Sequence, residues 1–383
     1  MAIPLLFLIA DTGGGHRAGA TAVARRIERD SPGTFDVHIV DPVASGSPAL
    51  LGRTADLYGP LIQHARWLWA AMYHATNSRA AIRMLRGSAL RPVRDAVAQL
   101  LTCLRPAAVV SFHPLLNHLA AQAVHTGAFP RVPVITVITD LVDVHAGWAC
   151  RDVDAVVIPS PGGLDRCRRA GIPAHRCHQL GLPVGSAFAR PLPTDQERRE
   201  LRHRLGLADD RFTVLVCSGA DGSGGLDRRA QAIAAARLDV GMAVICGRNA
   251  RARRRLEGLR DRAGRSIPVH GFVDDMADWM RAADLVVTKA GPGTIVESLC
   301  SGLPMLLTWY IPGQERGNLE WLVDTGAGRY VPGVGQLVDA VDELSAPRSP
   351  GLAAMRSAVA AVARPEATER IAALISGMAG GRT

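Results

Sequence analysis

Three consecutive glycines and a histidine follow an apolar run near the start of the chain. The apolar residues 6–10 lead into Asp11 and Thr12, and the glycines at 13–15 precede His16. Glycine has no Cβ, so its backbone can approach a ligand closely, and a helix that begins there offers unpaired N–H groups. Histidine titrates near neutral pH and can accept a proton from a hydroxyl group. The stretch therefore predicts a site that binds and deprotonates an acceptor hydroxyl.

A dinucleotide-binding turn is the alternative interpretation of these glycines. The letters GGGHR lack the G-x-G-x-x-G spacing, and no acidic residue ends the second predicted strand as that fingerprint requires. The spacing favours the acceptor site.

The richest set of candidate site residues lies between positions 287 and 331. A second strand-to-helix glycine turn there suits a diphosphate, because helix N-termini attract anions. Glu297, one turn later, can accept both hydroxyls of a ribose, while Gln314 and Glu315 can bond the hydroxyls of a sugar. The alternative is that these residues only cap helices and form loops. The presence of a diphosphate turn, a ribose carboxylate and sugar-binding side chains in one stretch favours a nucleotide-sugar site. The turn comprises Ala290, Gly291, Pro292, Gly293 and Thr294.

The bulk properties restrict the class of protein. The 383 residues are 48% hydrophobic and 21% charged, which predicts two folded domains and excludes a disordered chain. The net charge of +9 permits anionic partners, although a GC-rich genome that uses arginine where others use lysine explains the charge equally well. The seven cysteines form no C-x-x-C pair, which argues against disulfides and zinc and for free thiols in a reducing cytosol. We also expect neither a secretory leader nor a membrane span.

Short apolar runs alternate with helical stretches, which predicts an α/β fold with doubly wound parallel sheets. Helices are expected at 19–30, 227–236 and 294–301. The predicted strands are 4–10, 35–40, 108–112, 134–138, 155–158, 213–217, 243–246, 285–288 and 304–308.

The alternation falls into two similar halves. The strand and glycine loop of the first half recur as VLVCSGADGSGGLDRRAQAI, after a segment rich in proline and charge near residue 190. We therefore expect two Rossmann-like domains that face each other across a cleft. The predicted domains are 1–188 for the acceptor and membrane, 189–352 for the nucleotide-sugar, and a helical tail at 353–383 that could cross back to the first domain.

Residues 51–101 do not follow this alternation of strands and helices. The segment interleaves Tyr58, Trp67, Trp69 and Tyr73 with seven arginines, in a chain with only 4% aromatic residues. An aromatic, arginine-rich helix can lie in a membrane interface. An ordinary amphipathic helix pair with its aromatic side chains in the core is an equal alternative.

Taken together, the motifs resemble the monogalactosyldiacylglycerol synthase family of glycosyltransferases, and more distantly the peptidoglycan N-acetylglucosaminyltransferase. The likeness covers most of the chain and rests on DTGGGHRA, SFHPLLNH, TDLVDVHAGW, GLPV, CGRN, GFVDDM and TKAGPGTIVESLCSGLP…GQERGN, in family order. It implies a GT-B fold and inverting transfer of a hexose from a UDP-sugar to diacylglycerol. It also implies no cofactor, no catalytic metal and a peripheral position on an anionic membrane, which we expect to be the cytoplasmic face of the cell membrane.

On the acceptor side, the resemblance assigns His16 as the candidate general base, with Asp140 and His145 as positioning or proton-relay residues. Asp140 could instead cap a helix, and His145 could be a packed surface histidine. Further acceptor contacts are expected from Gly14, Gly15, Arg17 and His113. Arg17 could equally pair with a carboxylate, and His113 could be a core residue.

On the donor side, the resemblance places the diphosphate, uracil, ribose and sugar contacts along the second half. Arg248 and Asn249 match the family's GRN, whereas Phe272 and Val273 match a pair that holds uracil through backbone groups. The donor set comprises Ser218, Gly219, Gly222, Arg248, Asn249, Phe272, Val273, Ala290, Gly291, Gly293, Thr294, Glu297, Gln314, Glu315 and Asn318.

Two stretches depart from the family pattern. The donor loop SGADGSGG is less rich in glycine and adds Asp221, and VDVHAGWAC replaces residues resembling CHPTWFH. The second change affects the acceptor side. We expect transfer of galactose or glucose to a lipid, and the alternative functions are transfer to a soluble or polyprenyl acceptor, a UDP-sugar 2-epimerase and a non-catalytic binder. We expect no nucleic-acid partner, because no nucleic-acid-binding motif is visible.

Overall fold

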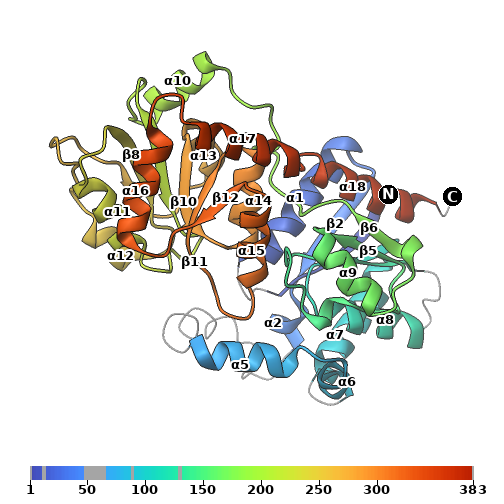
Figure 1. Cartoon of the computed structure of the whole chain (residues 1–383). Helices are drawn as coiled ribbons and strands as arrows, with labels where there is room; N and C mark the ends of the chain where they lie inside the picture. Colours follow the sequence, from blue (N-terminus) through green and yellow to red (C-terminus); the bar gives the residue numbers. More distant parts are fainter. Residues whose placement is uncertain (1, 11–13, 47–65, 88–89, 128–131, 382–383) are drawn as a thin grey trace. The chain divides into compact units, whose positions relative to one another are not determined.

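The computed structural model describes residues 2–10, 14–46, 66–87, 90–127 and 132–381 (Figure 1). The chain forms two compact units. Unit 1 comprises Met1–Ser186, Pro312–Gln314 and Glu366–Thr383, and unit 2 comprises Ala187–Ile311 and Glu315–Pro365.

Unit 1 contains a six-stranded parallel sheet in the order β2-β1-β3-β4-β5-β6. Its helices include α1, which follows β1, and α18, which comes from the far end of the chain. The elements are β1 (Ile3–Leu8), α1 (Gly14–Asp30), β2 (Phe35–Val40), α2 (Pro42–Gly46), α5 (Arg66–Thr76), α6 (Arg79–Gly87), α7 (Arg91–Leu104), β3 (Ala108–Ser111), α8 (Leu116–Thr126), β4 (Val134–Val137), η1 (Ala146–Trp148), β5 (Ala155–Ile158), α9 (Pro161–Arg169), η2 (Ala174–Arg176), β6 (Cys177–Gln179) and α18 (Ala367–Gly380).

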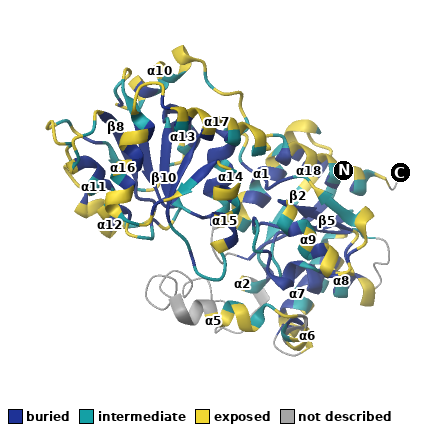
Figure 2. Cartoon of the chain, viewed as in Figure 1, coloured by how far each residue is buried: buried dark blue, intermediate teal, exposed yellow. Residues whose placement is uncertain are grey.

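Both faces of this sheet are buried, as the continuous apolar runs predict (Figure 2). Along β1, Leu6 and Leu8 pack with α7, α8 and α9, while Leu5 and Phe7 pack with α1 and α18. Successive side chains of a strand point to opposite faces, so one strand contributes to two cores.

Unit 2 contains a second six-stranded parallel sheet in the order β12-β11-β10-β7-β8-β9. One face carries α11, α12, α16 and α17, which share a core with alternate residues of β7, β8 and β10. The elements are α10 (Asp195–Arg204), β7 (Phe212–Cys217), α11 (Leu226–Ala235), β8 (Val240–Ile245), α12 (Ala250–Arg255), β9 (Val269–His270), α13 (Met276–Ala282), β10 (Leu285–Lys289), α14 (Pro292–Cys300), β11 (Met305–Trp309), α15 (Arg316–Asp324), β12 (Gly328–Tyr330), α16 (Val334–Ser345) and α17 (Pro350–Val362).

The expected fold class, with two doubly wound Rossmann-like domains, is confirmed by these sheets. The first and longest segment of unit 1 ends at Ser186, two residues before the expected boundary at 188. The expected tail at 353–383 is divided, because α17 belongs to unit 2 and α18 to unit 1. Thr368 of α18 bonds both the N–H and the carbonyl of Val184, at 2.9 and 2.8 Å, so the chain's last helix is tied to unit 1.

Candidate functional site

The acceptor-side motifs of unit 1 follow three neighbouring strands, β1, β3 and β4. His16 lies in the first turn of α1 after β1, His113 follows β3, and Thr139 and Asp140 follow β4. Ligands of open α/β sheets bind outside the carboxyl ends of the strands, which is the edge that these residues share. The structure therefore brings together motifs that are more than 120 residues apart.

His16 is held by a residue that the sequence analysis did not select. Its Nδ1 lies 2.8 Å from Oγ1 of Thr139. The His16 ring also lies edge-on to that of His113, with ring centroids 5.2 Å apart, and 6.0 Å from the ring of Trp148. If Nδ1 donates its proton to Thr139, Nε2 carries the lone pair that a general base needs.

Asp140 accepts hydrogen bonds from two residues of the loop that follows β4. Its Oδ2 accepts hydrogen bonds from Nε1 of Trp148 at 2.8 Å and from the backbone N–H of His145 at 3.3 Å. Burial raises the pKa of Asp140 to about 6, although these two hydrogen bonds lower it. Asp140 thus holds the indole that lies beside His16 and caps the loop, while its expected role in acceptor positioning or proton relay stays a prediction.

His145 is buried in the loop that follows β4. Its Nδ1 accepts the N–H of Gly147 at 3.1 Å, and its ring contacts that of Tyr73 with centroids 5.0 Å apart. Its Nε2 lies 3.3 Å from Oγ1 of Thr76. Burial lowers the pKa of His145 to about 4, so the imidazole is neutral near pH 7. These contacts describe a histidine that shapes the loop, and its assignment as a proton relay stays a prediction.

The remaining acceptor-side predictions lie at the same edge of the sheet. Burial, with smaller effects of the His16 and His145 charges, lowers the pKa of His113 well below its usual range, and the ring faces His16. Gly14, Gly15 and Arg17 belong to the first turns of α1, and nothing lies within 4 Å of a Cβ built on Gly15. Asp11, Thr12 and Gly13 lie outside the described residues.

The aromatic and arginine-rich segment is described only in part. Residues 47–65 and 88–89, with Tyr58 among them, lie outside the described residues, as do the side chains of Trp67 and Trp69. Tyr73 donates its hydroxyl to the carbonyl of Asp143 at 2.9 Å, and burial raises its pKa. For Tyr73 the core alternative therefore holds, because its ring packs on the acceptor-side loop.

The donor-side residues of unit 2 also follow neighbouring strands at their carboxyl ends. They come from five adjacent strands, β11, β10, β7, β8 and β9. Gln314 precedes α15 and is grouped with unit 1. Listed by the strand that they follow, the residues are Ser218, Gly219 and Gly222 after β7, Arg248 and Asn249 after β8, Phe272 and Val273 after β9, Ala290, Gly291, Gly293, Thr294 and Glu297 after β10, and Glu315 and Asn318 after β11.

The glycine loop after β7 has a backbone that requires glycine. Gly219 and Gly222 have φ values of +64° and +54°, which favour glycine. Asn249 fixes the loop, because its Nδ2 donates to the carbonyl of Gly222 at 2.8 Å while its Oδ1 caps α12. Ser218 donates its hydroxyl to the carbonyl of Ser223 at 2.6 Å, which closes the loop.

Replacement of Gly222 by alanine is expected to destabilise unit 2 by about 1–3 kcal/mol. A Cβ there would overlap the carbonyl oxygen of Cys246 and lie 2.8 Å from Cβ of Asn249. The measurement is thermal unfolding beside Gly335→Ala, where nothing lies within 4 Å of the added Cβ. An equal melting temperature for Gly222→Ala and the wild type would contradict this account of the loop.

Glu297 carries a carboxylate that no other described residue satisfies. It is partly buried on α14, and its carboxylate makes no hydrogen bond or ion pair within the described part of the chain. Burial raises the pKa of Glu297 to about 7. A desolvated carboxylate without a partner is costly for folding, and a ligand with hydroxyl donors would satisfy it. The expected contact of Glu297 with a ribose stays a prediction.

Glu315, by contrast, is fully engaged within unit 2. It is 2% exposed, pairs through Oε1 with Nζ of Lys289, and accepts the N–H of Ile311 through Oε2 at 2.9 Å. Asn318 donates to the carbonyl of Ala290 at 3.1 Å and thereby ties α15 to the glycine turn. In these contacts Glu315 and Asn318 hold the donor side together, and direct sugar contacts stay predictions.

Arg248 and Phe272 form an exposed pair beyond β8 and β9. The guanidinium carbon lies 5.2 Å from the centroid of the Phe272 ring, within cation–π range, and Phe272 is 55% exposed. A flat, exposed ring beside a strand end can stack with a nucleobase. This placement is compatible with the expected uracil site at Phe272 and Val273.

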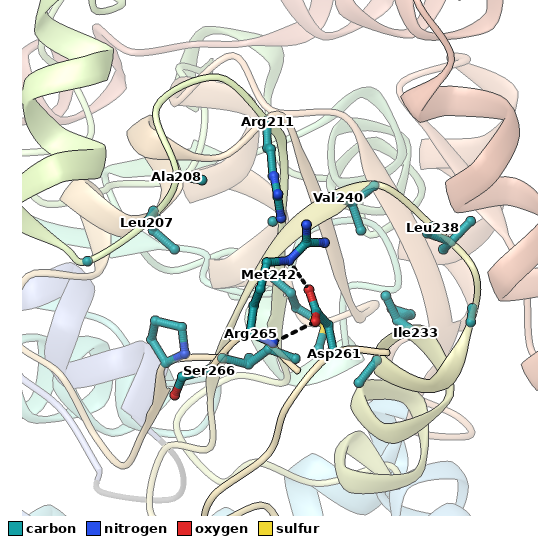
Figure 3. A pocket seen from close by; sticks show the side chains of 16 residues that line it. Leu207, Ala208, Arg211, Ile233, Leu238, Val240, Met242, Asp261, Arg265 and Ser266 are labelled. Carbon is teal, nitrogen blue, oxygen red and sulfur yellow. Dashed lines mark hydrogen bonds and ion pairs between the residues drawn. The ribbon is translucent and has the colours of Figure 1, made fainter. Parts of the chain in front are cut away.

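A cavity of about 180 Å³ lies at the other end of the strands of the second sheet, away from the donor-side residues (Figure 3). Arg211 precedes β7, and Val240 and Met242 belong to the first half of β8, so the cavity adjoins the amino ends of the strands. Its rim carries Arg265, which pairs with Asp261 at 2.5 Å. None of the motif residues lines it, so we do not assign the chemistry there.

Sequence comparisons identify the family. Residues 16–184 match the family model described as monogalactosyldiacylglycerol (MGDG) synthase, and residues 213–371 match the glycosyltransferase family 28 C-terminal domain. Monogalactosyldiacylglycerol synthase 1, chloroplastic, of Arabidopsis thaliana is 31% identical over 375 residues, which cover 96% of this chain and 69% of the relative. The chain belongs to the monogalactosyldiacylglycerol synthase family. Its members are glycosyltransferases, so the expected enzyme class is confirmed.

Solved structures show the same fold at low sequence identity. MurG of Acinetobacter baumannii superposes with a TM-score of 0.62 at 17% identity, covering 97% of this chain and 99% of that chain. A UDP-GlcNAc 2-epimerase of Neisseria meningitidis bound to UDP-GlcNAc superposes with a TM-score of 0.60 at 11% identity, covering 98% and 99%. These matches support the GT-B fold of this synthase-family chain and leave its substrates to other arguments.

Proposed function

We propose that the protein transfers a hexose, galactose in the first instance, from a UDP-sugar to diacylglycerol with inversion at the anomeric carbon. Membership of the synthase family supports the reaction class. The proposal uses no cofactor. It assigns the developing charge of the diphosphate to backbone N–H groups at the glycine turns, at the start of α14 and near Arg248.

The observation that carries the donor half is Glu297. Its partly buried carboxylate has no partner among the described residues, and it lies on the first turns of the helix that follows the Ala290–Thr294 turn. A ribose supplies two adjacent hydroxyl donors, which match the two oxygens of a carboxylate. Glycine turns for a diphosphate at the same sheet edge complete a nucleoside-diphosphate site.

The observation that carries the acceptor half is the environment of His16. Thr139 fixes one ring nitrogen, while His113 and Trp148 flank the ring. Neutral imidazole in such a setting can remove the proton of an acceptor hydroxyl, after which the oxygen attacks the anomeric carbon and UDP departs. A single displacement of this kind inverts the configuration.

Membership of the family and one surface feature support the proposal of a lipid acceptor and a membrane position. Met72 of α5 and Met84 of α6 are exposed at 49% and 71%, and the exposed Arg83 is next to Met84 in the chain. Exposed apolar side chains among arginines suit an anionic membrane surface, and we propose peripheral binding at the inner face of the cell membrane. No helix of the described residues is long and apolar enough to cross a membrane.

The test is UDP release from a panel of UDP-hexoses, with and without diacylglycerol in anionic vesicles. The proposal predicts release from UDP-galactose that depends on the lipid. Release that ignores the lipid would favour a soluble acceptor, and sugar epimerisation without release would favour the epimerase alternative. Either result would contradict the proposed acceptor.

A further inference from the structure

Lys289 is the only lysine in the chain, whereas the other 43 basic residues are arginines. It is the last residue of β10, immediately before the Ala290–Gly291 turn. Lysine carries a compact, mobile ammonium, while arginine carries a broad planar guanidinium. The single lysine therefore places the chain's one side-chain ammonium at the start of this glycine turn.

The side chain of Lys289 lies beside both glycine turns of unit 2. A Cβ built on Gly291 would be 2.8 Å from Nζ, and one built on Gly219 would be 3.7 Å from Cε and 3.9 Å from Oγ1 of Thr294. Both turns belong to the floor assigned to the diphosphate, one after β10 and one after β7.

Glu315 fixes the position of this cation. The Lys289 side chain is 14% exposed and its Nζ pairs with Oε1 of Glu315, whose side chain is 3% exposed. The second carboxylate oxygen is held by the N–H of Ile311. A buried pair is costly to form, so its presence at a ligand site favours a role beyond stability.

We propose that Lys289 binds the donor diphosphate and stabilises it as it leaves, with Glu315 as the residue that positions the ammonium. The inference rests on the proposed function and adds a charged group to the donor site. When the bond between the anomeric carbon and the β-phosphate oxygen breaks, the electron pair stays on that oxygen. An ammonium beside it offsets the new charge, and the acceptor proton moves to His16.

The single lysine allows a direct spectroscopic test on the intact protein. Reductive methylation with ¹³C-formaldehyde labels two amines, Lys289 and the α-amine, and each gives its own NMR signal. UDP and inorganic pyrophosphate are expected to shift the Lys289 signal, whereas uridine leaves it in place. Calorimetry on the same labelled sample reports whether UDP binds.

The possible outcomes separate two failures. If UDP binds and the Lys289 signal does not move, the inference about Lys289 is wrong while the proposed donor survives. If no UDP-sugar and no UDP bind at all, the proposed function is wrong and the inference falls with it.

Substitution gives an independent measurement. Lys289→Met should weaken UDP binding by about 10- to 100-fold, as loss of a charged hydrogen bond does, and leave uridine affinity within about twofold. Because the substitution leaves Glu315 unpaired, the double variant Lys289→Met with Glu315→Gln is measured as well. An equal loss for UDP and uridine in both variants would indicate structural damage and overturn the inference.

The matched control removes a cation far from the glycine turns. Arg204 on α10 is exposed and pairs with Asp278. Arg204→Met is expected to bind UDP as the wild type does. If it loses as much UDP affinity as Lys289→Met, the effect is one of overall charge and the inference is wrong.

Discussion

Replacement of His16 by alanine is expected to lower kcat by about 10²- to 10⁴-fold, the usual contribution of a positioned general base. The side chain is partly exposed at the start of α1, and its described hydrogen bond is to Thr139. Its removal leaves the core of unit 1 intact, so donor affinity and melting temperature should change little. The measurement is kcat for UDP release with saturating donor and lipid, beside thermal unfolding.

Thr139→Val provides the matched test of positioning. Valine keeps the shape of threonine and removes only the oxygen that lies 2.8 Å from Nδ1 of His16. We expect a smaller fall in kcat than for His16→Ala, and little further loss when the two substitutions are combined. Near-normal turnover of His16→Ala would remove histidine from the role of base.

Replacement of Glu297 by glutamine is expected to weaken binding of uridine and UDP together, by about 10- to 100-fold, because two charge-assisted hydrogen bonds to the ribose are lost. The variant is nearly isosteric and removes a buried charge, so the free energy of unfolding near pH 8 should stay equal or rise. Ligand-observed NMR titration with uridine measures the affinity without any phosphate. Unchanged uridine affinity would show that Glu297 does not contact the ribose.

The pH dependence gives a second signature of the same residue. Burial raises the pKa of Glu297 to about 7. The stability linked to its protonation is present below the ordinary carboxyl pKa and is lost as the pH rises through about 7. Only the ionised form accepts from both ribose hydroxyls, so uridine affinity should rise between pH 6 and 8. In Glu297→Gln this rise should disappear, and its persistence would assign the titration to another group.

The layered fold was predictable because buried parallel strands are continuous apolar runs. Nine strands were expected, and the described residues contain three more, β6, β9 and β12. All three are edge strands of two or three residues, such as Val269–His270, and so short a run carries no periodicity. The start of α1 was expected at residue 19, and it begins at Gly14 because a glycine run alone gives no helical pattern.

Candidate site residues could be selected where chemistry needs a rare pattern in the sequence, and their roles stay predictions. Glu297 and the two glycine turns of the second half were selected from spacing, and the structure places them at the carboxyl ends of the strands of unit 2. Thr139 was missed because a threonine at a strand end is ordinary, and only the fold brings it to His16 from 123 residues away. Trp148 was quoted within a motif but given no role, since its bond to Asp140 depends on the loop conformation. Lys289 carried a signal, as the only lysine in the chain, that the motif analysis did not use.

The most direct test of the account is hexose transfer itself, measured with UDP-galactose labelled in the sugar and diacylglycerol in anionic vesicles. The account predicts that label enters a lipid-extractable product in equal amount to the UDP released, with inverted anomeric configuration, and that His16→Ala abolishes most of it. Label that never enters the lipid while UDP still binds would contradict the proposed acceptor and the role of His16. In that case only the donor site of unit 2 would remain supported.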